Sequence, residues 1–120
     1  MQDMIRVAVD AMGGDNAPDE IIKGAMEAVA LREDIQVLLV GKEELIREKL
    51  KGYSYREQQV EVVNATEVIE TAEPPVAAIR TKKDSSIVVG LKLVKEEKAD
   101  AFVSAGSSGA VLAGGQLLVG

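Results

Sequence analysis

Small hydroxyl and glycine residues occupy positions 104–109, between the apolar run 101–103 and a second apolar run at 110–113. This order predicts a strand, a loop and the start of a helix. Such a loop presents backbone N–H groups and hydroxyls at the positive end of a helix, where phosphate or another oxyanion binds. Glycine lets the backbone approach that ligand closely. A tight turn with serine caps explains the same residues equally well.

A second candidate for chemistry is the loop at residues 10–15, which follows a predicted strand at 4–10. Ligands of open α/β folds bind at the carboxyl ends of the strands, where the two aspartates of this loop could position a substrate. The loop lacks a G-x-G-x-x-G pattern, which argues against a dinucleotide. The alternative is structural: Gly13 and Gly14 permit the turn, and Asp15 adds negative charge at a helix start.

Three cations lie within four residues at Arg80, Lys82 and Lys83, and residues 84–86 follow as a helix-capping cluster. The cations could bind a phosphate, with Arg as a fork and Lys as a point charge. A solvated basic turn before a capped helix is the alternative. In a doubly wound sheet, this run and the loop 10–15 lie near the same edge, so the two could converge.

The composition restricts the chemistry. The chain has no Cys and no His, which excludes a thiolate or imidazole nucleophile, base or metal ligand. Its net charge of −6 argues against binding to nucleic acid. Neither a secretory signal nor an apolar run long enough to span a bilayer is present, so we expect a cytoplasmic protein without disulfides, metal or cofactor.

Hydropathy predicts an α/β fold with a mostly parallel sheet, because apolar runs alternate with amphipathic segments. The expected strands are 4–10, 35–40, 60–63 and 101–104. The expected helices are 18–32, 42–51, 76–80, one beginning near residue 86 and one beginning near residue 107. For the first helix we expect Asn16 or Ala17 as N-cap, Pro18 in the first helical position and one buried stripe that reaches Ala30. The chain ends on the apolar run 117–120, from which we expect a fragment, or an end that packs against something else.

Three segments in order resemble one family: residues 10–18, Arg80 with residues 82–86, and residues 99–106. Together they resemble the phosphate acyltransferases of bacterial phospholipid synthesis, the PlsX family, over essentially the whole chain. The resemblance implies a three-layer α/β/α sandwich similar to the isocitrate and isopropylmalate dehydrogenases. On this basis residues 1–120 are the N-terminal part of one α/β domain, and the C-terminal half of the family fold is absent.

The resemblance also implies an activity: transfer of a fatty acyl group from acyl carrier protein to inorganic phosphate, which gives an acyl phosphate. Family members are homodimers and associate peripherally with the membrane, through contacts that we expect in the missing half. Ser107 and Ser108 stand where members commonly have Asn-Thr. Ser108 keeps a hydroxyl in place of that of threonine, whereas Ser107 lacks the amide of asparagine. Roles that need a hydroxyl therefore carry over better than roles that need an amide. A non-catalytic phosphate- or nucleotide-binding module and an inactive folded fragment are the alternatives.

Phosphate is already an anion at neutral pH and can attack a thioester without a base, so the reaction needs positioning and stabilisation of the oxyanion. A covalent acyl-serine is disfavoured because no base is visible beside the serines. We therefore expect two sets of site residues. The expected catalytic residues are Lys82, Lys83 and Ser108, and the expected phosphate-binding residues are Asp10, Gly13, Gly14, Arg80, Ser104, Gly106, Ser107 and Gly109.

Overall fold

The computed structural model describes residues 4–14, 16–69 and 73–105. The strands are β1 (Ile5–Asp10), β2 (Ile35–Gly41), β3 (Val60–Asn64) and β4 (Ala101–Val103). The helices are α1 (Asp19–Leu31), α2 (Glu43–Leu50), α3 (Pro75–Thr81) and α4 (Ser86–Lys95), with a 3-10 turn η1 (Glu57–Gln59) before β3. The expected α/β alternation is confirmed.

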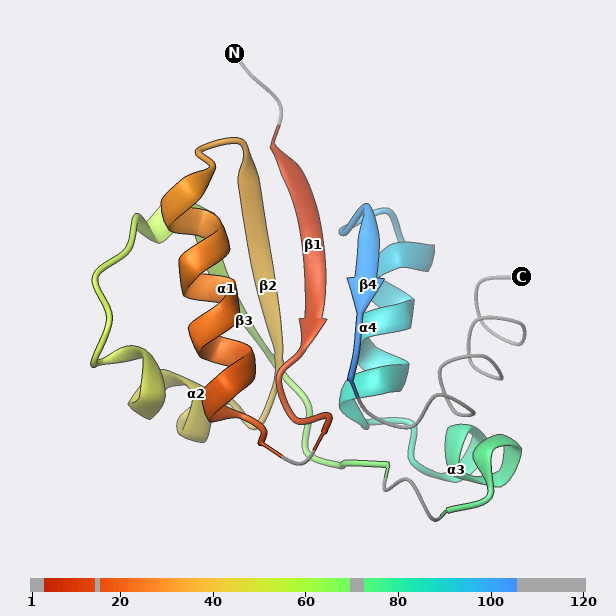
Figure 1. Cartoon of the computed structure of the whole chain (residues 1–120). Helices are drawn as coiled ribbons and strands as arrows, with labels where there is room; N and C mark the ends of the chain where they lie inside the picture. Colours follow the sequence, from red (N-terminus) through yellow and green to blue (C-terminus); the bar gives the residue numbers. More distant parts are fainter. Residues whose placement is uncertain (1–3, 15, 70–72, 106–120) are drawn as a thin grey trace.

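The four strands form one parallel sheet in the order β3-β2-β1-β4 (Figure 1). Asp10 pairs with Val40 of β2, and Val9 pairs with Val103 of β4. Along the chain, β2 pairs with one side of β1 and β3 pairs with β2. The last strand, β4, then pairs with the other side of β1. The strand order therefore reverses between β1 and β4, at the point where open α/β sheets bind ligands.

Helices cover both faces of the sheet, with α1 and α2 on one face and α4 on the other (Figure 1). Successive residues of a strand point to opposite faces. In β2, Val37 and Leu39 accordingly pack with α1 and α2, while Leu38 packs in the cluster that contains Leu93 of α4. The expected three-layer α/β/α arrangement is present, and its sheet is parallel throughout the described strands.

Local sequence signals account for several helix starts. Ser85 is the N-cap of α4 and accepts a hydrogen bond from the Val88 N–H at 3.2 Å, as its place in the capping cluster predicts. Pro75 lies in the first turn of α3, where its missing N–H is tolerated. The first turn of α2 is capped from a distance, since the Asn64 side chain accepts from the Glu43 N–H at 3.1 Å.

The start and end of α1 differ from the expectation. Pro18 is the N-cap itself, and it makes no side-chain cap bond, so neither Asn16 nor Ala17 caps the helix. Backbone bonding replaces the side-chain cap, because the Asn16 carbonyl accepts from the Glu20 N–H. Ala30 is exposed rather than buried, because the helical rotation turns it away from the sheet while Val29 beside it stays buried; Leu31, the last residue of α1, is 86% exposed.

The expected strand 101–104 ends one residue early, at Val103. The helix expected from residue 107 lies outside the described residues. Within the part of the chain that the structure describes, none of the helices combines the length and apolar character needed to span a membrane.

Candidate functional site

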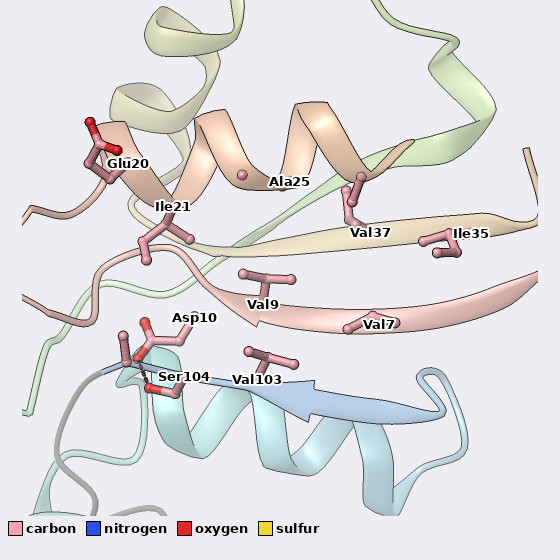
Figure 2. A pocket seen from close by; sticks show the side chains of 13 residues that line it. Val7, Val9, Asp10, Glu20, Ile21, Ala25, Ile35, Val37, Val103 and Ser104 are labelled. Atoms are coloured by element: carbon pink, nitrogen blue, oxygen red, sulfur yellow. Dashed lines mark hydrogen bonds between the residues drawn. The ribbon is translucent and has the colours of Figure 1, made fainter. Parts of the chain in front are cut away.

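A buried carboxylate joins the ends of β1 and β4. Asp10, the last residue of β1, is 1% exposed. Its Oδ1 atom accepts from the Met12 N–H at 3.0 Å, which closes the turn after β1. Its Oδ2 atom accepts from the Ser104 hydroxyl at 2.8 Å, immediately after β4 (Figure 2). Two residues that are 94 positions apart thus meet where the strand order reverses.

The loops that follow these strands also touch each other. Gly14 has a φ of +90°, a conformation that side chains with a Cβ atom rarely adopt. A Cβ atom at this position would lie 3.4 Å from both the Cβ atom and the carbonyl oxygen of Ala105. Gly13 beside it is buried. The structure therefore brings together four of the expected site residues: Asp10, Gly13, Gly14 and Ser104.

An apolar cavity of about 410 Å³ lies between α1 and the strands β1 and β4 and reaches Asp10 and Ser104 at one end (Figure 2). Its larger apolar lining residues are Val7, Val9, Ile21, Ile35, Val37 and Val103. Its charged lining residues are two carboxylates, Asp10 and Glu20, and neither Lys nor Arg occurs among the described residues that line it. The interior of this cavity is therefore a poor place for an anion.

The basic run is organised around Lys82. The Lys82 ammonium donates to the Glu73 carboxylate at 2.8 Å and to the Val68 carbonyl at 2.9 Å. It thereby ties the end of α3 to the residues that precede the helix. Arg80 and Lys83 are exposed.

The run lies at the end of the sheet to which the β1 arrow points (Figure 1). Among the contacts described, those of Lys82 connect it to Val68 and Glu73 rather than to Asp10 or Ser104. The expected convergence of the basic run with the loop 10–15 stays a prediction at the level of side-chain contact.

A second carboxylate organises the start of α4. The Oδ2 atom of Asp84 accepts from the Thr66 N–H at 3.0 Å and from the Thr66 hydroxyl at 2.5 Å. These hydrogen bonds lower the pKa of Asp84 below its usual value. Glu67 continues the connection, because its N–H donates to the Asp84 carbonyl and its carbonyl accepts from the Ser86 N–H. The segment after β3 thus holds the basic run in place.

Sequence reasoning missed Thr66, Val68 and Glu73. A hydroxyl or a carbonyl 14 to 18 residues from its partner carries no local spacing signal, and a glutamate before two prolines resembles any turn. Gly106, Ser107, Ser108 and Gly109, which belong to the expected phosphate loop, lie outside the described residues. Within residues 4–14, 16–69 and 73–105, the acidic side chains form no cluster of three that could hold a metal ion.

Comparison with known proteins identifies the family of this chain. The model of a family described as "Fatty acid synthesis protein" matches residues 5–120. A phosphate acyltransferase of Thermoanaerobacter pseudethanolicus is 53% identical over 97% of this chain and 34% of its own length. Proteins of the same name from Syntrophomonas wolfei and Clostridium tetani are 54% and 49% identical over 97% of this chain, and 36% and 35% of their own lengths. The chain spans about a third of these curated relatives, and it belongs to the fatty acid synthesis protein family.

Proposed function

We propose that this chain forms the phosphate-handling part of a phosphate acyltransferase, which transfers a fatty acyl group from acyl carrier protein to inorganic phosphate. The observation that carries the proposal is the junction of the two loops, where Asp10 accepts from Ser104 and Gly14 lies against Ala105. This junction lies at the reversal of strand order, and close relatives are named phosphate acyltransferases.

The residues have separate roles in this proposal. The loop 104–109, with Ser104, Gly106, Ser107 and Gly109, binds phosphate, and Ser108 offers a hydroxyl to the reacting group. Asp10, Gly13 and Gly14 form the adjacent floor, while Arg80, Lys82 and Lys83 supply positive charge. A hydrogen bond to an anion from a charged donor is about twice as strong as one between neutral groups.

In the proposed reaction, a phosphate oxygen attacks the thioester carbonyl, the C–O bond forms, and the C–S bond breaks with departure of the thiolate. The protein contributes position and stabilisation of the oxyanion. The Asp10 carboxylate beside Ser104 does not make this serine a nucleophile, because a carboxylate is a far weaker base than a serine alkoxide. Its hydrogen bond instead orients the hydroxyl.

Further properties of the complete enzyme belong to the same proposal. We expect acyl carrier protein as the donor, a homodimer, and a cytoplasmic protein with peripheral membrane association. We expect the surfaces for dimerisation and membrane contact in the part of the relatives that this chain does not match, since it spans about a third of their length.

Lys82 gives the sharpest test, because it has a measurable structural role as well as the proposed one. The test uses a chimera in which this chain replaces the matching segment of the Thermoanaerobacter relative. This chimera carries one of three substitutions: Lys82→Ala, Glu73→Gln or Lys83→Ala. Lys82→Ala is expected to slow acyl-phosphate formation well over tenfold, where each tenfold corresponds to about 1.4 kcal/mol. Glu73→Gln breaks the same ion pair but keeps the ammonium, so phosphate dependence should survive.

Equal loss of stability and of phosphate response in Lys82→Ala and Glu73→Gln would contradict the assignment, because it would leave Lys82 a purely structural role. Calorimetry of the chain with phosphate, nucleotides and acyl carrier protein separates the proposal from its main alternative. Tight binding of a nucleotide without a response to phosphate would favour a non-catalytic nucleotide-binding module.

A further inference from the structure

The apolar cavity between α1 and the strands β1 and β4 leaves part of the sheet uncovered. On the sheet side it is lined by Val7 and Val9 of β1 and by Val103 of β4. Val7 and Val9 are only half-buried, and Val103 is 55% exposed. Because removal of apolar surface from water is the main favourable term in association, this face of the sheet offers most to an apolar ligand.

The helix side of the same cavity is built from small residues. Gly24, Ala25 and Ala28 of α1 line it, and their spacing of three and four residues places them on one face of the helix. Side chains of this size do not fill the space between α1 and β1. The resulting volume of about 410 Å³ lies in the range of cavities that bind small molecules.

The two ends of the cavity differ in polarity. In Figure 2, Asp10, Glu20 and Ser104 lie at one end, whereas Val7 and Ile35 lie at the other. The polar end contains Ser104, the first residue of the candidate phosphate loop, and lies where the strand order reverses. A long apolar ligand can therefore lie along the cavity with one end beside that loop.

The charges of the lining distinguish between apolar ligands. Its charged side chains are the carboxylates of Asp10 and Glu20, and neither Lys nor Arg lines it among the described residues. A free fatty acid, which is ionised at neutral pH, would add a third negative charge at the polar end, and like charges brought together cost free energy. An acyl thioester is uncharged at its carbonyl and meets no such repulsion.

We propose that this cavity binds the alkyl chain of the acyl thioester, with the reacting carbonyl at the Ser104 end and the chain directed between α1 and β1 toward Val7 and Ile35. This inference rests on the proposed function, because it assumes that phosphate attacks at the loop that begins with Ser104. It assigns the two substrates to different surroundings, since phosphate binds at the loop and the alkyl chain binds in the apolar cavity. Side chains at the Val7 end then determine which chain lengths fit.

Two substitutions at that end should change the preferred chain length in opposite directions. Ile21 lies at the Ser104 end in Figure 2, so Ala28, about two helical turns later, lies toward the other end. In the chimera with the Thermoanaerobacter relative, Ala28→Phe should lower kcat/KM for long-chain relative to short-chain thioesters of acyl carrier protein by about tenfold or more. Val7→Ala enlarges the same end and should shift the preference toward longer chains.

Ala30→Phe is the matched control, because it adds the same bulk to α1 at an exposed position outside this cavity. The chain-length preference should survive in this variant. Urea denaturation of all three variants establishes that each is folded. An unchanged preference in folded Ala28→Phe and Val7→Ala overturns the inference, and it would indicate that another part of the relative covers this face of the sheet.

Binding to the 120-residue chain tests the role of charge without turnover. Calorimetric titration at neutral pH should show that decanol, which is neutral, binds about tenfold or more tightly than decanoate. Glu20→Gln should narrow this difference, because it removes one of the two carboxylates. Equal affinity for the two probes, or binding of neither, overturns the inference and leaves the phosphate site untouched. Failure of the unaltered chimera to form acyl phosphate from any chain length overturns the proposed function instead, so the two failures are distinguishable.

Discussion

Three aspartates, one buried and two exposed, use their carboxylates to connect segments that are distant in the chain. Asp10 uses one oxygen to close its own turn and the other to hold Ser104, so one residue both shapes a loop and links two distant segments. Asp100 links two distant segments at the other end of β4, where its carboxylate accepts from the Arg6 N–H at 2.8 Å. Asp84 fixes the start of α4 through Thr66. Each carboxylate accepts backbone or hydroxyl hydrogens that water would otherwise bind.

Acid should weaken the fold through two of these carboxylates. Hydrogen bonds from Thr66 and from Arg6 hold the pKa values of Asp84 and Asp100 below their usual value. A lowered folded-state pKa contributes stability that is present above the unfolded value of about 4 and is lost as the pH falls through the folded value. The free energy of unfolding, measured by urea denaturation, should therefore decline as the pH drops below about 4.

Asp100→Asn should flatten that decline, because it removes one of the carboxylates whose pKa is lowered in the folded chain. Leu31→Ala, which changes an exposed residue and removes no titrating group, is the control and should leave the acid profile unchanged. A decline of the same steepness in Asp100→Asn would assign the acid sensitivity to other groups.

At the scale of elements, two glycines within helices have opposite environments. Gly90 of α4 faces β4, and a Cβ atom there would lie 2.2 Å from the Cε1 atom of Phe102. This glycine permits the close approach of the helix to the strand. At Gly24 of α1, no described residue outside the neighbouring turns of the helix comes within 4 Å of a Cβ atom built there. The same residue type is thus required in one helix and dispensable in the other.

Alanine substitutions at Gly90 and at Gly24 should change the stability of the fold in opposite directions. Gly90→Ala should lower the free energy of unfolding by about 1–3 kcal/mol, because the added methyl group overpacks the contact with Phe102. Gly24→Ala should raise it by about 1 kcal/mol through helix propensity alone. Chemical denaturation of both variants beside the unaltered chain gives the two values, and a stabilised Gly90→Ala would show that α4 can move away from the sheet at little cost.

At the scale of the whole molecule, the sheet is the layer that both helical layers share. Leu39 is fully buried in the cluster with α1 and α2, whereas Leu38 belongs to the cluster on the α4 side. Adjacent residues of one strand therefore support opposite layers. Small domains with a shared core unfold cooperatively. A destabilising substitution on one face of the sheet should therefore also destabilise the helix on the other face.

Leu39→Ala should lower the free energy of unfolding by about 2–5 kcal/mol, the usual effect of leaving such a cavity in a core. The amide protons of α4, on the far face, should lose protection against hydrogen exchange by the same free energy as those of α1. Leu31→Ala, at a residue that is 86% exposed, is the control and should change stability by no more than about 0.5 kcal/mol. Loss of protection confined to α1 and α2 would show instead that the two layers unfold independently.

The sequence by itself determined the elements, their parallel pairing and the family, because hydrophobic periodicity, glycine and proline signals and ordered motifs are local properties of a chain. Local signals of this kind mark residues 10–15, 80–86 and 104–109 as candidate site segments. Only the tertiary structure decided what these segments contact. The hydrogen bond from Ser104 to Asp10 and the ion pair of Lys82 with Glu73 depend on strand order and loop paths, which no local spacing encodes. The buried carboxylate that accepts the Ser104 hydrogen bond was therefore invisible in the sequence, and only the fold reveals it.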